Sequence, residues 1–145
     1  MTVLLEVNVL VALTWPNHVH HRLARSWFRK NHAKGWATCS ITENGFVRIS
    51  SNPRVVDEAR TPAEAVLLLR QLVQVEGHRF WQDDLSITQA ELVDTERIRG
   101  YRQVMDAHLL ALARRHGGCL ATFDRKIAEL LPRGVDARKY VLMLS

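Results

Sequence analysis

The sequence predicts a single α/β domain, a three-layer sandwich with a mostly parallel central sheet flanked by helices. Short apolar segments typical of buried parallel strands alternate along its 145 residues with amphipathic helical segments. The length is that of one domain, and no repeat or long linker divides residues 1–145. Hydrophobic residues make up 47% of the chain and charged residues 24%, which excludes intrinsic disorder and supports a sizeable core. Two cysteines are too few for a disulfide scaffold.

The first elements follow from the apolar start of the chain. Thr2–Val7 is almost uniformly apolar and predicts a strand covered on both faces. Asn8 can cap a short helix over Val9–Thr14, and Pro16 ends that helix. The longest apolar run is about half of a bilayer span and lacks the marks of a signal peptide. We therefore expect a cytoplasmic protein with no membrane partner.

A second helix and a second strand come next. The helix is predicted from apolar residues at every fourth position: Val19, Leu23 and Trp27. Gly35–Cys39 predicts the second strand. Ser40–Glu43 matches a capping box that opens a helix, whose apolar residues are Phe46, Val47 and Ile49.

The middle of the chain repeats this pattern of helix and strand. Thr61–Glu64 is a second capping box, with proline at the first helical position. The helix that it opens is predicted over Ala63–Glu76 and ends at Gly77. His78–Gln82 predicts a short strand, which a turn at Asp83–Asp84 follows.

The strongest helical signal lies in the last third of the chain. Tyr101–His116 has an apolar face, and the two glycines at 117–118 end it. The residues expected to point inward are Val104, Leu109, Leu112 and Ala113. Cys119–Phe123 predicts a buried strand, after which Asp124 begins a helix. Lys139–Leu144 predicts the last strand.

The charge is basic and concentrated near the N-terminus. The chain has 20 Lys and Arg against 15 Asp and Glu, a net charge of +5 that modestly favours a nucleic-acid partner. Arg22, Arg25 and Arg29 share one helix face and could follow an RNA backbone, or form an ordinary solvated face. The histidines at 18, 20 and 21 match no standard zinc spacing and are interpreted as surface or interface residues.

Four carboxylates stand where a parallel sheet would bring them together. Glu6 lies near the end of the first strand, Glu43 starts the helix after the second, Asp106 lies on the strongest helix, and Asp124 follows the Cys119–Phe123 strand. Each has a simpler interpretation: Glu43 as part of a capping box, Asp124 as a helix cap, Asp106 on a solvated face. Glu6 is the hardest to explain in that way, because an unpaired charge in an apolar strand is strongly disfavoured.

Carboxylates that do converge need a cation or raised pKa values. Two carboxylates 4 Å apart repel by about 4 kcal/mol at an effective dielectric constant near 20. Oxygen ligands without matching His or Cys residues favour Mg²⁺ or Mn²⁺. A metal held in this way can activate water and neutralise charge that develops on a phosphate. This set of residues therefore indicates phosphodiester hydrolysis.

Four segments that contain these acids resemble the signature segments of PIN-domain ribonucleases, in particular the VapC-type toxins of bacterial toxin–antitoxin pairs. They are Leu4–Leu10, Thr42–Arg48, Met105–Ala113 and Ala121–Arg125. The resemblance covers nearly the whole chain in order, spacing and length. It implies a PIN-like fold and a metal-dependent endoribonuclease toxin that acts on structured RNA. It also implies a homodimer and neutralisation by a small cognate antitoxin.

The resemblance also implies roles for individual residues. Glu6, Glu43, Asp106 and Asp124 would form the catalytic acidic group, with Asn8 as a polar neighbour that supports the site. Glu6, Asp106 and Asp124 would hold Mg²⁺, or Mn²⁺ in its place. Glu43 would either complete the ligand shell or orient a water molecule.

Glu6 departs from the family pattern, which has Asp at this position. The extra methylene moves the carboxylate by about 1.5 Å, and Mg²⁺ tolerates little distortion of its octahedral shell. We therefore expect a weakened nuclease. The alternative is a catalytically impaired module that binds RNA or an antitoxin. A phosphoryl-transfer protein is disfavoured because the first strand lacks paired acids and no suitably placed lysine follows a late strand. The absence of a phosphate-binding glycine motif disfavours nucleotide-cofactor enzymes.

Overall fold

The sheet of this protein, as seen in a computed structural model that describes residues 1–89 and 91–145, is parallel throughout. Its strand order is β3-β2-β1-β4-β5, with five strands in the described part of the chain. The strands are β1 (Val3–Leu5), β2 (Trp36–Cys39), β3 (His78–Trp81), β4 (Cys119–Thr122) and β5 (Val141–Met143). The predicted parallel sheet is confirmed.

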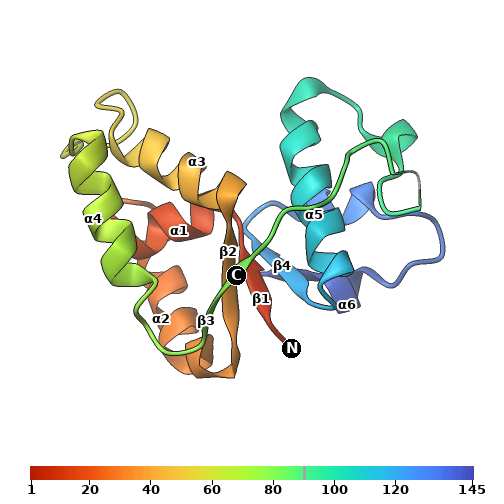
Figure 1. Cartoon of the computed structure of the whole chain (residues 1–145), viewed down its shortest axis with the longest axis horizontal. Helices are drawn as coiled ribbons and strands as arrows, with labels where there is room; N and C mark the ends of the chain where they lie inside the picture. The colour runs from red at the N-terminus through yellow and green to blue at the C-terminus, as the bar shows by residue number, and fades with distance from the viewer. Residues whose placement is uncertain (90) are drawn as a thin grey trace.

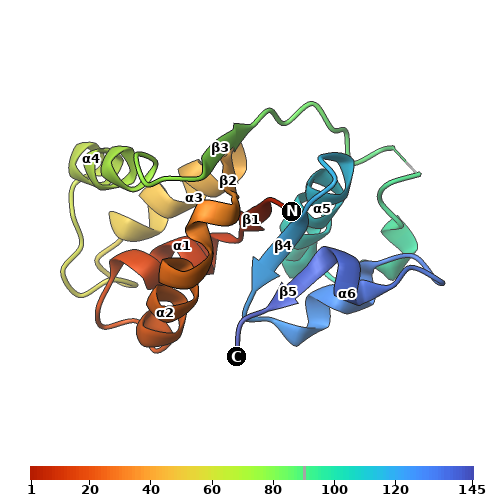
Figure 2. The same cartoon turned by 90° about the horizontal axis from the view of Figure 1, so that it is seen from below.

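Helices cover both faces of the sheet, as predicted (Figure 1; Figure 2). One face carries α1 (Val7–Thr14), α2 (His21–Asn31), α3 (Ser40–Ser50) and α4 (Pro62–Leu72). The other carries α5 (Val104–Arg115), the 3₁₀ helix η4 (Arg125–Leu130) and α6 (Ala137–Tyr140). A separate apolar core lies on each face, one built around Leu5 and Phe46 and the other around Leu4 and Leu112. None of the helices in the described ranges has the length and apolar character that a bilayer crossing needs.

The chain changes direction across the sheet between β1 and β4. From β1 it proceeds to β2 and β3 on one side, and then returns to place β4 on the other side of β1. Leu4 pairs with Leu120, and the backbone N–H of Glu6 donates to the carbonyl oxygen of Ala121 at 3.1 Å. In open parallel sheets, ligands bind beyond the carboxyl ends of the strands at such a switch point. The residues that follow β1 and β4 therefore occupy the favoured place for a site.

The junction between β1 and α1 differs from the prediction. The strand ends at Leu5, and α1 already begins at Val7. Glu6, rather than Asn8, is the N-cap, because its side chain accepts a hydrogen bond from the backbone N–H of Asn8. A carboxylate satisfies a free N–H group and lies at the positive end of the helix, so the earlier start is favourable.

The two predicted capping boxes have different outcomes. The box at Thr61 and Glu64 is confirmed, although α4 ends at Leu72 rather than Glu76. The box at Ser40 and Glu43 is wrong, because Cys39 is the N-cap and Thr42 closes the box. The side chain of Glu43 is thereby free for another partner.

Two apolar residues that were expected to point inward are exposed. Val19 is 85% exposed, because α2 begins only at His21 and leaves this residue in the preceding turn. Val104 is 42% exposed, because it is the first residue of α5. The segment before it is a separate 3₁₀ turn, η3 (Tyr101–Gln103). The remaining predicted inward residues of α5 are buried: Leu109, Leu112 and Ala113.

Two glycines with positive φ should respond differently to alanine. At Gly77, where φ is +92°, an added Cβ would collide with the backbone carbonyl oxygen of His32. At Gly117, where φ is +70°, a Cβ would meet open space. We expect Gly77→Ala to lower the free energy of unfolding by about 3 kcal/mol or more, and Gly117→Ala by only about 1 kcal/mol. Chemical denaturation measures both values, and equal losses would contradict this account of the β2–β3 edge.

Candidate active site

Three of the predicted acidic residues meet at the carboxyl edge of β1 and β4. Glu6 directly follows β1, Asp124 lies two residues beyond the end of β4, and Asp106 lies in the first turn of α5. Glu6 and Asp106 line one cavity of about 540 Å³, and Glu6 and Asp124 line a second of about 430 Å³. Glu6 thus stands where the two cavities adjoin, with one of the other acids in each.

Glu6 is a buried carboxylate with strongly altered proton affinity. The residue is only 9% exposed. Burial, followed by the negative charges of Asp106 and Asp124, raises its pKa to about 7, although the backbone N–H of Asn8 stabilises the ionised form. The charge effects place all three carboxylates within electrostatic reach of one another.

Asp106 and Asp124 differ from Glu6 in their local environments. Burial and the charge of Asp124 raise the pKa of Asp106 to about 6. The backbone N–H of Asp124 donates to Thr122 Oγ1 at 3.0 Å, and Asp124 Oδ1 accepts from the backbone N–H of Lys126 at 2.9 Å. Asp124 therefore caps η4, as the sequence indicated, and its carboxylate also borders the cavity.

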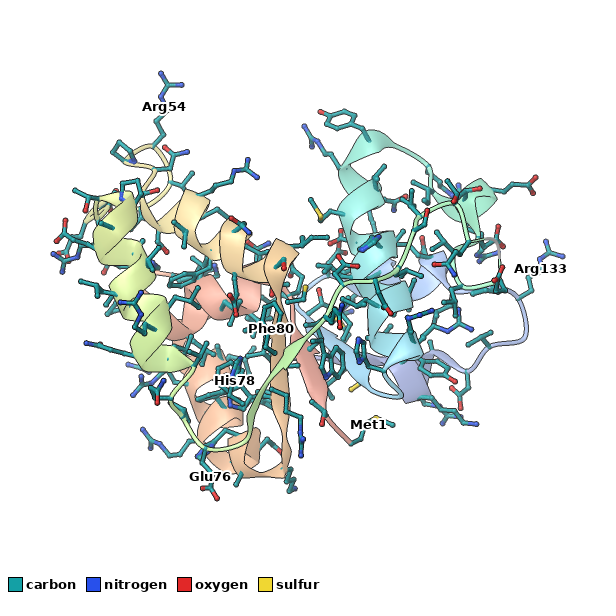
Figure 3. The ribbon with its side chains drawn as sticks, viewed as in Figure 1. Met1, Arg54, Glu76, His78, Phe80 and Arg133 are labelled. Atoms are coloured by element: carbon teal, nitrogen blue, oxygen red, sulfur yellow. The ribbon has the colours of Figure 1, made fainter. Side chains whose placement is uncertain are left out.

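Glu43 has a different environment from the other predicted acids. Its carboxylate accepts a hydrogen bond from Thr38 Oγ1 at 2.6 Å, and Thr38 Oγ1 lies 2.8 Å from Nε2 of His78. Figure 3 labels His78 and Phe80 on the edge strand β3. Glu43 lines neither of the two cavities that Glu6 borders. The geometry thus gathers three of the four predicted carboxylates and directs the fourth toward β2 and β3.

The larger cavity lies between α3 and the start of α5, and Glu6 and Asp106 are part of its lining. Its α3 wall includes Ser40, Asn44 and Arg48, and its opposite wall includes Arg102 and Met105. Asn8, the predicted supporting residue, borders both cavities. The sequence interpretation missed Arg48 and Arg102, whose only signal was a basic side chain within the matching segment or just before it.

The predicted arginine face lies outside these cavities. Arg22, Arg25 and Arg29 line a separate exposed hollow along α2, together with Lys30. Two of the neighbouring histidines are part of the acidic site: His18 and His20 line the 430 Å³ cavity with Phe123 and Asp124. Spacing in the sequence could not reveal this contact, because Phe123 comes from the end of β4.

The donor set suits a hard divalent cation. The three acids offer only oxygen atoms, and Mg²⁺ is commonly held by one or two carboxylates with water completing its shell. Within the ranges 1–89 and 91–145, no three His, Cys, Asp or Glu side chains already enclose a metal position. Burial, and after it the neighbouring negative charge, raises the pKa values of Glu6 and Asp106, and a cation bound beside them would stabilise their ionised forms.

Comparisons with known proteins agree with this picture. The family model described as the PIN domain matches residues 3–130. Ribonuclease VapC38 of Mycobacterium tuberculosis is 52% identical over 127 residues, which cover 88% of each chain. Ribonuclease VapC39 of the same organism is 47% identical over 135 residues, which cover 93% of this chain and 97% of the relative. Ribonuclease VapC44, also from this organism, is 44% identical over 128 residues, or 88% of this chain and 89% of the relative.

The metal-free protein should lose stability as Glu6 ionises. Its pKa is about 7 in the folded chain and 4.5 in the reference state, so between these values the folded chain binds more protons than the unfolded one. The stability that the protonated group contributes is complete below pH 4.5 and is lost as the pH rises through 7. Relative to the wild type, Glu6→Gln should therefore gain on the order of 2 kcal/mol between pH 4.5 and 8.

Denaturation in the presence of EDTA measures this difference. Glu64→Gln is the matched control, because hydrogen bonds at the exposed cap formed with Thr61 lower the pKa of Glu64 instead of raising it. The control should show no gain over the same pH range. If the difference in free energy of unfolding between Glu6→Gln and the wild type does not change with pH, the raised pKa of Glu6 is contradicted.

Proposed function

The chain belongs to the PIN-domain family as a VapC-type member, and from this premise we propose that it is a Mg²⁺-dependent endoribonuclease toxin. Its substrate on this proposal is structured RNA, whose phosphodiester bonds it hydrolyses. The observation that carries the proposal is the meeting of Glu6, Asp106 and Asp124 at the switch point of the sheet, beside open cavities. The names of the relatives support the same reaction class.

The three carboxylates would hold the ion, and Asn8 would support them from the first turn of α1. When bound, the ion supplies an activated water molecule and neutralises charge on the reacting phosphate. Glu6 and Asp106 would hold it in their ionised forms, because ligand carboxylates must be deprotonated. No histidine or lysine base is then required at the site.

Basic residues near the acids are suited to bind the RNA backbone. Arg48 on α3 and Arg102 before α5 lie on the two walls of the 540 Å³ cavity. They would contact phosphates on either side of the scissile bond. The row formed by Arg22, Arg25 and Arg29 would follow the backbone farther out, so that RNA affinity falls with rising salt concentration.

Glu6 would weaken the enzyme relative to a chain with aspartate at this position. The longer side chain caps α1 through the backbone N–H of Asn8, which fixes its carboxylate at the start of the helix. A displacement near 1 Å at a reacting centre costs on the order of 100-fold in rate. The same feature favours a second candidate function, a catalytically impaired module that binds RNA or a protein partner.

The proposed partners are a small cognate antitoxin and a second copy of the chain. An antitoxin would neutralise the toxin by placing a cationic side chain among the three carboxylates, where it would replace the charge of the metal. Exposed apolar residues lie next to the cleft and suit a protein contact: Tyr101, Val104 and Met105.

Removal of a ligand carboxylate should abolish cleavage, whereas removal of the Glu43 charge should not. We expect Asp106→Asn and Asp124→Asn each to lower the rate of Mg²⁺-stimulated RNA cleavage by about 100-fold or more. Glu43→Gln should change the rate by less than about 5-fold, because its carboxylate is bonded to Thr38 outside the cavities. Gel-based single-turnover kinetics give all three rates. Unchanged cleavage by both aspartate variants would refute the proposed active site. A large loss of rate in Glu43→Gln would show that Glu43 is part of it.

Shortening Glu6 should strengthen the enzyme. Glu6→Asp is expected to raise the rate of Mg²⁺-dependent cleavage by about 10-fold to 100-fold, because the carboxylate then takes the position typical of the family. The measurement compares both proteins on the same RNA at saturating Mg²⁺. A gain supports attenuation by Glu6, whereas equal rates would remove that part of the proposal. RNA binding without cleavage by either protein would favour the impaired binding module.

A further inference from the structure

Three aromatic side chains form a compact group beside Asp124. The ring of His20 stacks on the ring of Phe123, with centroids 4.3 Å apart and planes inclined by 24°. The ring of His18 lies 5.8 Å from that of His20 and 6.2 Å from that of Phe123. All three residues are partly exposed. Their contact connects the turn between α1 and α2 with the residue that follows β4.

This aromatic group, His18, His20 and Phe123, lines the 430 Å³ cavity together with three polar residues. The polar residues are Glu6, Asn8 and Asp124. A cavity of this size lies within the range of small-ligand pockets. Its occupant would therefore touch aromatic ring faces and the proposed metal ligands at the same time.

The hydrogen bonding of His18 leaves a donor on its ring. Nδ1 accepts a hydrogen bond from the backbone N–H of His20 at 3.0 Å. In the neutral ring the proton is then on Nε2, which can donate to a base or sugar oxygen. The aromatic group thus offers a specific polar contact in addition to ring faces.

We propose that the aromatic group is a nucleobase subsite, which positions the nucleotide next to the scissile phosphate. This inference rests on the proposed nuclease function and assigns its substrate contacts. A nucleotide combines a planar base with a phosphate, and sequence-tolerant stacking on aromatic side chains is a common way to bind single-stranded RNA. The phosphate would lie near Glu6 and Asp124, where a bound divalent ion would compensate the negative charge.

Exposed cations that neighbour the cavity residues in the sequence suit a nucleotide as the occupant. Arg22 closely follows the histidine turn, and Arg125 and Lys126 follow Asp124 directly. All three are exposed. These cations are suited to contact phosphates that flank the bound nucleotide. An arginine of a partner is the competing occupant, and the experiment below distinguishes the two.

The test compares ligands that differ only in the base. Nucleoside 5′-monophosphates and ribose 5-phosphate are titrated with the full-length protein in Mg²⁺, and NMR follows the imidazole protons of His18 and His20. We expect at least one nucleotide to bind about 10-fold more tightly than ribose 5-phosphate, the effect of one stacked base. That ratio should fall to about 1 in His20→Ala and in Phe123→Leu, and persist in Phe123→Tyr, which retains a ring.

The control is His116→Ala, which removes another stacked imidazole. His116 stacks on Trp81 with centroids 4.5 Å apart and planes inclined by 7°, and it lines neither cavity of the acidic site. This variant should keep the wild-type ratio. Thermal unfolding of every variant shows whether a lost ratio reflects a lost fold, and the Phe123→Tyr result must hold in a protein of wild-type stability.

The outcomes separate this inference from the proposed function. A ratio of 1 in the wild type, or no nucleotide binding, overturns the subsite even where the protein cleaves RNA. Binding of N-acetylarginine amide in place of nucleotides also overturns it, in favour of a protein partner. A base-dependent ratio that the variants abolish upholds the subsite, even where no RNA is cleaved and the nuclease proposal fails.

Discussion

Crowded negative charge at one edge of a parallel sheet is the constraint on which the site of this protein depends. Glu6 and Asp124 follow adjacent strands, and Asp106 comes to them on the first turn of α5. Burial and the charges of Asp106 and Asp124 raise the pKa of Glu6 to about 7, and burial and the charge of Asp124 raise that of Asp106 to about 6. A fold that only had to be stable would not place the buried Glu6 beside two other acids, because a buried charge near like charges is unfavourable without a cation.

The sheet supplies the arrangement that makes this crowding unavoidable. Where the strand order reverses between β1 and β4, residues of α1, α3 and α5 line the 540 Å³ cavity. The two cores hold these layers in place through buried side chains on both faces of β1, among them Leu4 and Leu5. The hydrophobic layers therefore fix the positions of the three acids. The arginines and aromatic rings line the cavities around these acids.

Much of the site could be predicted from the sequence, because it follows from strand ends. Glu6 and Asp124 stand out as charges next to apolar strands, and Asp106 as the acid at the start of the strongest helix. The direction of the Glu43 side chain was harder to predict. The capping box of α3 forms one residue earlier than its sequence suggests, and one residue corresponds to about 100° around a helix. Local propensity did not determine that register, so the direction of the Glu43 carboxylate was not predictable.

The aromatic group beside Asp124 shows a second limit of the sequence. Phe123 is far from His18 and His20 in the chain, and each of the three alone has the character of an ordinary surface or strand residue. Their contact depends on how the turn after α1 packs on the end of β4, which is tertiary information.

The most direct test of the shared acidic pocket is a crystal structure of the protein soaked in Mn²⁺, with the ion located by its anomalous scattering. We expect one or two anomalous peaks within coordination distance of carboxylate oxygens from Glu6, Asp106 and Asp124, while Glu43 keeps its bond to Thr38. Peaks at other surface positions only, or three acids directed to separate regions, would contradict the account.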